Sequence, residues 1–246
     1  MAKRITRAKR GLDAVSLGEP GDLATVLRVL YLVFNEGYGG DVDLAAEAIR
    51  LTRQLRTGTG EPEVAGLLAL MLLHQARRPA RTTSTGQLVP LGRQDRSRWD
   101  TTLIAEGVDI LQHALARDRL GEYQAQAAIA ALHADAETFA ETDWPQILSW
   151  YDELLALTNS PVVQLNRVVA ITEANGPRAG RAELDRMDSG IPRFAAVAAY
   201  VAERLGDLEQ AAQSYAAAAR AATSVAERDH LLREAARTRS LTARAN

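Results

Sequence analysis

The histidines and acidic residues of this chain are the first candidates for catalytic or metal-binding chemistry. Its four histidines are scattered singly, as His74, His113, His133 and His230. None is spaced from another histidine or a carboxylate so that one helix would present a metal site. The H-E-x-x-H, G-x-S-x-G and P-loop patterns are absent, and no nucleophile has an obvious base beside it. We therefore predict no catalytic residue, no metal site and no cofactor.

Two polar clusters that adjoin apolar helices are better candidates for binding. In the first, Asn35, Glu36 and Tyr38 follow an apolar helical stripe. A carboxylate at the C-terminal end of a helix opposes the helix dipole, at a cost of about a few tenths of a kcal/mol. This unfavourable charge indicates a specific partner for Glu36, such as an arginine.

The second cluster flanks a segment without helical periodicity. Arg77 and Arg78 end a helix, where they complement its dipole, and Asp95, Arg96 and Trp99 follow on the far side of the segment. One interpretation is structural, with an Asp–Arg ion pair and a tryptophan anchor closing the loop onto the core. The other is a polar recognition patch.

Composition narrows the class of protein. The chain has 246 residues, no cysteine and a net charge of -2, which excludes a disulfide framework and argues against general polyanion binding. Its longest nearly unbroken apolar run, residues 64–73, is half of a bilayer span. The basic start, residues 1–10, is followed by no apolar stretch of a signal peptide. We expect a soluble, cytoplasmic protein with no membrane partner.

Helical periodicity positions these clusters. Apolar residues recur at i, i+3, i+4 and i+7 almost everywhere, and we predict an all-α fold of about eleven helices in antiparallel pairs. The last five are expected at about 161–175, 177–187, 192–205, 207–221 and 225–241. The period stops in one long insertion at about 80–99, where residues 87–91 could form a short strand. Loops of this length in a compact domain are functional or disordered.

The second half of the chain contains a repeat signal. Gly206, Asp207, Ala211, Tyr215 and Ala218 fit the tetratricopeptide (TPR) pattern G-D-x-x-x-A-x-x-x-[FY]-x-x-A. Small residues at fixed points let paired helices cross closely, and the aromatic residue fills the space between them. We therefore predict a TPR-like helical-repeat array.

The same segments carry a family resemblance. The motifs, in order, are residues 29–38, 46–51, 67–74, 76–81, 94–100, 123–134, 142–144 and 160–167. As a set they resemble the extracytoplasmic-function (ECF) sigma factors that have a large C-terminal TPR-like extension. The resemblance covers about residues 22 to 221.

The resemblance also suggests a domain division. Residues 1–12, rich in Lys and Arg, look like the tail of sigma region 4, and residues 13–21 form a linker. An N-terminal helical subdomain (22–135) and TPR-like repeats (136–246) follow, or a single domain over 22–246. Sigma regions 2 and 4 are missing, so we expect a truncated extension or an orphan that does not bind DNA specifically. Arg93 also departs from the family, where this position is usually acidic.

The resemblance implies a non-catalytic regulatory domain that binds a protein: RNA polymerase, the sigma core or a signalling protein. We predict one polar patch of partner-binding residues, comprising Asn35, Glu36, Tyr38, Arg77, Arg78, Asp95, Arg96 and Trp99. Asn166 and Arg167 are candidate groove residues of a repeat. The alternatives are a free-standing TPR-like adaptor unrelated to transcription and a small-molecule sensor.

Overall fold

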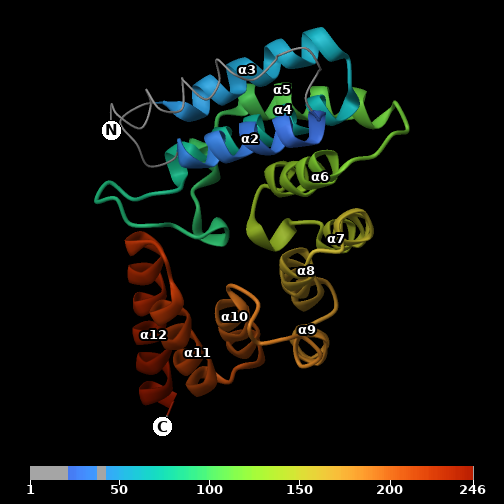
Figure 1. Ribbon diagram of the computed structural model, residues 1–246. Helices are drawn as coiled ribbons and strands as arrows, with labels where there is room; N and C mark the ends of the chain where they lie inside the picture. Colours follow the sequence, from blue (N-terminus) through green and yellow to red (C-terminus); the bar gives the residue numbers. More distant parts are fainter. Residues whose placement is uncertain (1–21, 38–42, 246) are drawn as a thin grey trace, which may run out of the picture. The chain divides into compact units, whose positions relative to one another are not determined.

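A computed structural model describes residues 22–37 and 43–245. In these residues the chain is all-α, with eleven α-helices and no β-strand (Figure 1), which confirms the predicted class and number of helices. The helices are α2 (Leu23–Glu36), α3 (Leu44–Thr59), α4 (Pro62–Ala76), α5 (Thr101–Leu115), α6 (Glu122–Asp135), α7 (Trp144–Thr158), α8 (Pro161–Ala174), α9 (Pro177–Leu184), α10 (Phe194–Leu205), α11 (Leu208–Ala221) and α12 (Val225–Ala245). The proposed remnant at 1–12 and the linker at 13–21 lie outside the described residues.

The chain divides into two compact units, Met1–Gln54 and Leu55–Asn246. In the first unit the carboxylate of Asp22 caps α2 by accepting hydrogen bonds from the backbone N–H groups of Ala24 and Thr25. Gly37 ends this helix, and a Cβ at this position would collide with the backbone of Ala45. Glycine is therefore required where the chain leaves α2 beside the start of α3.

In the second unit α4 forms the centre of a three-helix group. It packs against both α5 and α6, and its side chains from Leu67 to Leu73 are all buried. A helix that is apolar all round is buried on most faces. The apolar run at 64–73 therefore lies at the centre of this group.

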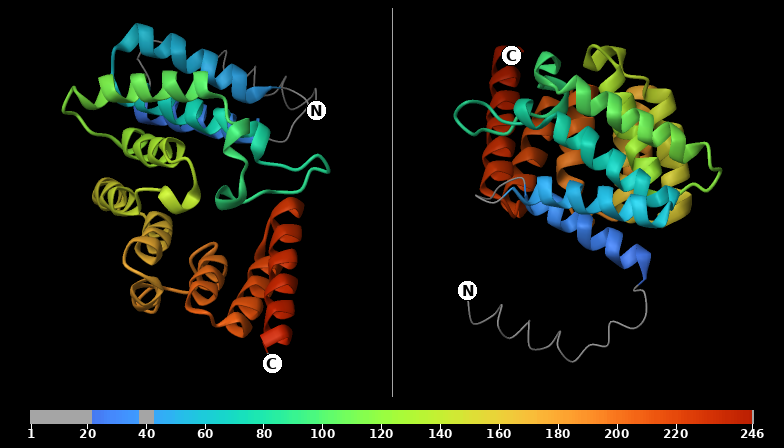
Figure 2. Two further views of the ribbon diagram at one scale, coloured as in Figure 1. Left: turned by 180° about the vertical axis from the view of Figure 1, so that it is seen from behind. Right: turned by 90° about the horizontal axis from the view of Figure 1, so that it is seen from above.

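From α6 onward each helix packs against the next along the chain. Three buried clusters join successive groups of helices: the first joins α6, α7 and α8, the second α8, α9 and α10, and the third α10, α11 and α12. The last two helices lie side by side in both views of Figure 2. This nearest-neighbour packing is compatible with the predicted helical-repeat array. The predicted boundary at 135/136 falls between α6 and α7, which pack together; the domain division stays a prediction.

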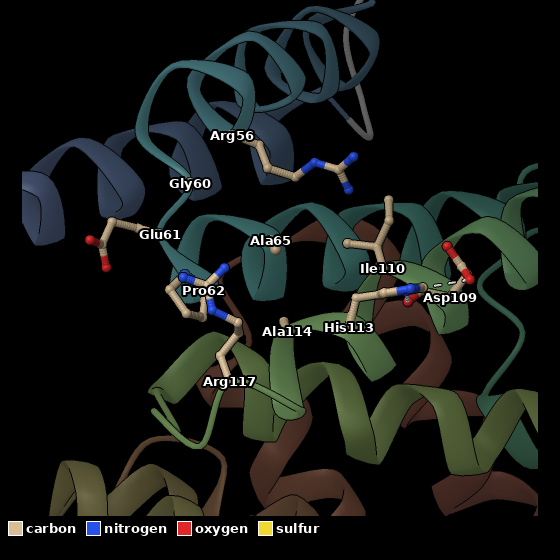
Figure 3. A pocket seen from close by; sticks show the side chains of 10 residues that line it. All are labelled: Arg56, Gly60, Glu61, Pro62, Ala65, Asp109, Ile110, His113, Ala114 and Arg117. Atoms are coloured by element: carbon tan, nitrogen blue, oxygen red, sulfur yellow. Dashed lines mark hydrogen bonds and ion pairs between the residues drawn. The ribbon is translucent and has the colours of Figure 1, made fainter.

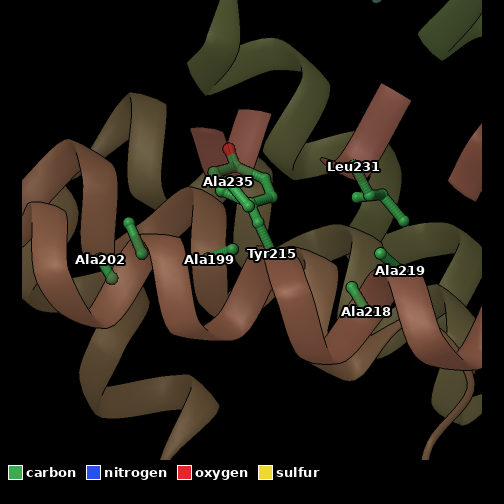
Figure 4. Close-up of a cluster of buried hydrophobic side chains, with 8 residues drawn as sticks. Ala199, Ala202, Tyr215, Ala218, Ala219, Leu231 and Ala235 are labelled. Carbon is green, nitrogen blue, oxygen red and sulfur yellow. The ribbon is translucent and has the colours of Figure 1, made fainter. Parts of the chain in front are cut away.

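The third cluster, which we call the alanine core, is built mainly from small side chains (Figure 4). Its buried members are Ala199, Ala202, Ala211, Tyr215, Ala218, Ala219, Leu231 and Ala235. Gly206 ends α10 in the left-handed conformation, with φ of 83°, and Asp207 caps α11. Each residue of the TPR pattern therefore has the packing or capping position that the pattern predicts.

The insertion separates α4 from α5, as predicted. It contains three 3₁₀ turns, η1 (Arg78–Ala80), η2 (Leu91–Arg93) and η3 (Arg96–Arg98), and one isolated antiparallel bridge between Thr82 and Leu88. The possible strand at 87–91 does not form, because Pro90 has no N–H to extend the pairing and η2 begins at Leu91.

Two predicted helix ends are also wrong. Helix α12 continues to Ala245 rather than ending at about 241. Helix α9 ends at Leu184 rather than at about 187. The N–H groups of Arg186 and Met187 bond three residues back, to Glu183 and Leu184, so the helix closes in a turn.

None of the described helices is both long and apolar enough to cross a membrane.

Candidate functional site

A tryptophan in contact with two arginines anchors the insertion within the second unit. Trp99 is 5% exposed. The guanidinium carbon of Arg96 lies 4.8 Å from the centre of its ring, and that of Arg77 lies 5.9 Å from it. Both distances are in the range of cation–π contacts. The structure therefore brings together three of the predicted patch residues, around a side chain that is itself buried.

Arg96 also closes the C-terminal end of α6. Its Nη1 donates hydrogen bonds to the backbone carbonyls of His133 and, at 2.6 Å, of Ala136. The last carbonyls of a helix have no intrahelical partner, and a cation there complements the helix dipole. We call Arg77, Arg96, Trp99 and His133 the insertion anchor.

His133 is the buried titratable member of the insertion anchor. Its ring meets Trp144 edge-on, with 5.3 Å between ring centres. Burial, together with the positive charges of Arg77 and Arg96, lowers the pKa of His133 to about 4. The imidazole is therefore neutral at physiological pH and cannot serve as a cation there.

Several buried polar atoms near this anchor make no hydrogen bond within the described residues, 22–37 and 43–245. They are Nη2 of Arg96, Nε1 of Trp99, Nδ1 of His133 and Oε1 of Gln94. Because buried polar groups are usually hydrogen-bonded, this region retains unused hydrogen-bonding capacity. Its chemistry suits a small polar group better than an apolar one.

The insertion is also tied to the last helix by a residue that the sequence did not assign to a site. Both terminal nitrogens of Arg93 donate to the carboxylate of Glu234, at 2.6 and 2.9 Å. Glu234 also accepts from Nε of Arg237 at 2.7 Å, and these arginines lower the pKa of the Glu234 carboxyl against the opposing effect of burial. No local signal could reveal this pair, which joins residues 141 positions apart.

The other two predicted patch residues of the insertion, Asp95 and Arg78, contact or cap residues close to them in sequence. The carboxylate of Asp95 accepts hydrogen bonds from the backbone N–H and hydroxyl of Ser97 and so caps η3. These bonds lower the pKa of Asp95, which is exposed. Arg78 is half-buried at the start of η1. The predicted Asp–Arg pair is therefore not what positions Asp95.

The predicted patch residues Asn35 and Glu36 belong to the first unit, whereas Arg77, Arg96 and Trp99 belong to the second. Asn35 and Glu36 are exposed at the end of α2, in the unit Met1–Gln54, and Tyr38 lies outside the described residues. The single patch that would unite them with Arg77 and Arg96 stays a prediction.

The two candidate groove residues on α8 differ in character. Asn166 is exposed. Arg167 bonds Asp152 of α7 at 2.6 Å and lies 3.8 Å from Glu183 of α9. Arg167 therefore links three consecutive helices, and Asn166 is the member available to a partner.

A pocket that was not predicted opens beside α4 and α5 (Figure 3). It has a volume of about 430 Å³, a floor that includes Pro62, Ala65, Ile110 and Ala114, and a rim that includes the exposed Arg56, His113 and Arg117. The Nδ1 atom of His113 is 2.7 Å from the carbonyl oxygen of Asp109. The acid Glu61 on the rim pairs with Arg119 at 2.7 Å. An apolar floor with two flanking arginines suits an apolar group that carries a carboxylate.

A weak sequence signal for this pocket was present. Ile110, His113, Ala114 and Arg117 follow i, i+3, i+4 and i+7 spacing on one helix face. That spacing also describes an ordinary packed helix, so it could not distinguish a pocket from a core contact.

A second hollow lies between α11 and α12, with a volume of about 640 Å³. Its lining combines small side chains with charged ones, including Ala212, Ala216, Glu209, Arg220 and Arg239. Both faces come from consecutive helices of the stack.

In the described part of the chain, no group of three or more histidine, aspartate or glutamate side chains is arranged to hold a metal ion.

Comparison with known proteins gives a family match and one relative. A family of unknown function, DUF6596, matches residues 22–115. An uncharacterized protein of Rhizobium meliloti (strain 1021) is 44% identical over an alignment of 203 residues, and the match covers 75% of this chain and 48% of the relative. The chain therefore spans about half the length of that relative. No solved structure matches.

Proposed function

We propose that this chain is a non-catalytic regulatory domain of an ECF sigma factor, which modulates transcription initiation by binding RNA polymerase, the sigma core regions or a signalling protein. The observation that carries the proposal is the position, in the structure, of the motifs that resemble the ECF sigma factors. Residues 29–38, 67–74, 123–134 and 160–167 lie mainly on α2, α4, α6 and α8. An ordered set of motifs, each lying mainly on one helix, is what a shared scaffold would produce.

The length of the R. meliloti relative is compatible with this proposal. The match covers 48% of that protein, so about half of its length lies outside the match. Sigma regions 2 and 4 could occupy such additional length. We propose the same regulatory role in transcription for that relative.

The pocket of Figure 3 is the surface best suited to a protein partner. Arg56 and Arg117 are exposed on its rim, and Ile110 and Ala114 are buried in its floor. A partner segment with an apolar side chain next to an acidic residue would fill the floor and pair with the rim. Apolar anchors in pockets with a polar rim are typical of protein interfaces.

Binding of the full chain to bacterial core RNA polymerase, and separately to a protein of sigma regions 2 and 4, would test this proposal by biolayer interferometry. If the pocket makes the contact, the double reversal Arg56→Glu/Arg117→Glu should weaken binding by at least about tenfold, as for loss of close interfacial charge pairs. The matched control is Arg178→Glu/Arg228→Glu, which changes net charge equally at two exposed positions outside the pocket. Equal weakening by both variants would contradict the pocket, and no binding to either analyte would contradict the sigma-factor proposal.

The hollow between α11 and α12 favours a second candidate, a TPR-like adaptor unrelated to transcription. The alanine residues of its lining leave room for a peptide, and Glu209, Arg220 and Arg239 can read the charges of that peptide. A pull-down from a bacterial extract separates the candidates. Recovery of polymerase subunits or a sigma factor supports the first candidate. Recovery of other proteins, without polymerase or a sigma factor, supports the second if the variant Ala212→Trp/Ala216→Trp no longer recovers them.

A further inference from the structure

The insertion anchor holds a positive charge that no acidic residue of the described chain, 22–37 and 43–245, neutralises by an ion pair. Arg96 is half-buried, and its Nη1 donates to backbone carbonyls rather than to a carboxylate. Burial lowers the pKa of Arg96, and the charge of Glu141 opposes this effect. The Glu141 carboxylate accepts two hydrogen bonds from Thr138. Because a charge removed from water is costly unless it is paired, the anchor favours a bound anion.

Two hydrogen-bond donors of the anchor are buried and unused. Trp99 is 5% exposed, and its Nε1 makes no hydrogen bond in the part of the chain that the structure describes. The same is true of Nη2 of Arg96, whose guanidinium lies over the Trp99 ring, 4.8 Å from its centre. Both nitrogens can only donate. A group that satisfies them must therefore be an acceptor.

His133 supplies a third nitrogen beside these donors. It is 9% exposed, its carbonyl accepts a hydrogen bond from Arg96, and its Nδ1 makes none to any described residue. The imidazole is neutral at physiological pH, because burial and then the charges of Arg77 and Arg96 lower its pKa to about 4. A neutral imidazole donates from Nδ1 when that nitrogen carries the proton. Arg96, Trp99 and His133 therefore offer three donors within one small region.

The other charges around these donors are positive. The guanidinium carbon of Arg77 lies 5.9 Å from the centre of the Trp99 ring. The pKa of His74 is lowered to about 3 by burial and then by neighbouring positive groups, with no carboxylate opposing them. Arg77 and Arg96 are half-buried rather than enclosed, so the anchor borders on solvent, from which an ion can enter.

We propose that the insertion anchor is a binding site for a phosphate group, held by Arg96, Trp99 and His133. Phosphate oxygens are strong acceptors, and the negative charge of the group pairs with the guanidinium. Three oxygens of a tetrahedral phosphate can meet three donors, whereas a carboxylate has only two. The ligand is the free ion or the phosphate of an ester. The proposal depends neither on the sigma-factor proposal nor on the pocket of Figure 3.

The proposed ligand joins two elements of the second unit. Arg96 lies in η3 and Trp99 directly after it, whereas His133 lies in the last turn of α6. A ligand that binds both elements stabilises the arrangement that binds it. Saturating inorganic phosphate should therefore slow amide hydrogen exchange in residues 94–99 of the full chain. Unchanged exchange in this segment would overturn the proposal.

The indole N–H signals test the site directly. The chain has three tryptophans, and the signal that is absent from Trp99→Phe in ¹⁵N-resolved NMR spectra belongs to Trp99. Titration with inorganic phosphate should shift this signal saturably and leave that of Trp150, on α7, in place. Sodium chloride at equal ionic strength is the control. Absence of a saturable shift, or an equal shift with sodium chloride, would overturn the proposal.

Isothermal titration calorimetry measures the contribution of each donor. Trp99→Phe should weaken the binding of inorganic phosphate by at least about tenfold, because it removes one hydrogen bond to a charged group. Arg96→Lys keeps a cation but loses the second N–H, and it should weaken binding to a similar extent. The matched controls are Trp150→Phe and Arg98→Lys, the latter at an exposed position of η3. Circular dichroism checks that each variant is folded. Equal affinity in Trp99→Phe and Trp150→Phe would overturn the proposal.

Methyl phosphate distinguishes the two sources of the ligand. Binding of inorganic phosphate with much weaker binding of methyl phosphate supports a site for the free ion. Similar affinity for both supports a site for the phosphate group of a larger molecule. Binding of neither would overturn the proposal.

Discussion

The insertion anchor and the alanine core hold helices together in opposite ways. In the anchor, Arg77 and Arg96 contact the buried Trp99, and Arg96 binds backbone carbonyls at the end of α6. In the alanine core, most buried side chains are methyl groups that let α10, α11 and α12 approach closely. The first arrangement depends on a few large, polar, specific contacts and the second on many small, interchangeable ones.

This difference has an energetic consequence. Removing one large anchor residue deletes many contacts at once and leaves polar atoms buried. A single change in the alanine core removes little, because each methyl group contributes about 0.8 kcal/mol on burial. We therefore expect single substitutions to be more costly in the anchor.

Trp99→Ala should have the largest effect. Truncation of a buried tryptophan typically reduces the free energy of unfolding by about 3 to 5 kcal/mol, and Trp99 also contacts two guanidinium groups. Urea denaturation followed by circular dichroism would measure the loss. Ala202→Gly in the alanine core should cost about 1 kcal/mol.

Trp99→Phe is the control for this prediction. It keeps an aromatic ring and removes Nε1, which makes no hydrogen bond in the part of the chain that the structure describes. Trp99→Phe should therefore cost much less than the alanine variant. If Trp99→Ala costs no more than Ala202→Gly, the contrast between the two regions is wrong.

Acid should weaken the anchor more than the alanine core. The pKa of His133 falls from 6.5 to about 4 on folding, so the unfolded chain takes up a proton that the folded chain refuses. The stabilisation is complete above pH 6.5 and is lost as the pH falls toward 4, at about 1.4 kcal/mol per pH unit. His74, whose pKa is lowered to about 3 chiefly by burial, acts in the same direction.

His133→Gln isolates this contribution. Between pH 7.5 and pH 5 the free energy of unfolding should fall by about 2 kcal/mol less in this variant than in the unmodified chain. His230→Gln, on the half-buried face of α12, should change the fall by less. An equal fall in His133→Gln and the unmodified chain would show that His133 is not buried neutral.

The same contrast explains what the sequence could and could not predict. The roles of Gly206, Asp207 and Tyr215 were predictable because a left-handed turn, a helix cap and a packed aromatic each have a local pattern. The insertion itself was recognisable from the loss of helical period. Its contacts were not, because Arg96 binds carbonyls 37 and 40 residues away and Arg93 binds Glu234 at 141 residues.

The candidate site shows the same limit. The sequence singled out Arg96 and Trp99 as unusual, but the pattern could not separate a loop anchor from a recognition patch. Arg77 reaches Trp99 from the end of α4, and Arg96 reaches it from η3, near the far end of the insertion. The pocket beside α4 and α5 is lined by residues that lie between positions 56 and 117 and come together only in the fold. No single sequence motif contains them.

Arg93→Ala tests whether the insertion supports the last helix. The pair with Glu234 is bidentate but half-exposed on the arginine side, so the loss should be about 1 to 2 kcal/mol. Hydrogen exchange should rise in residues 89–94 and in the middle of α12. Arg98→Ala, at an exposed position of η3, is the matched control, and equal exchange in both variants would contradict the link.

Tyr215→Phe should have the smallest effect. It tests whether packing or the hydroxyl hydrogen bond contributes more to the stability of the alanine core. The hydroxyl of Tyr215 donates to Glu203 at 3.0 Å, and Glu203 also accepts from Arg237 at 2.6 Å. Because Arg237 remains, loss of the hydroxyl should cost only about 0.5 to 1 kcal/mol in urea denaturation. Tyr215→Ala, which empties the space between α10, α11 and α12, should cost several times more. If the two variants are equally unstable, the hydrogen bonds among Tyr215, Glu203 and Arg237 stabilise this region more than packing does. The alanine core would then depend on specific polar contacts, as the insertion anchor does.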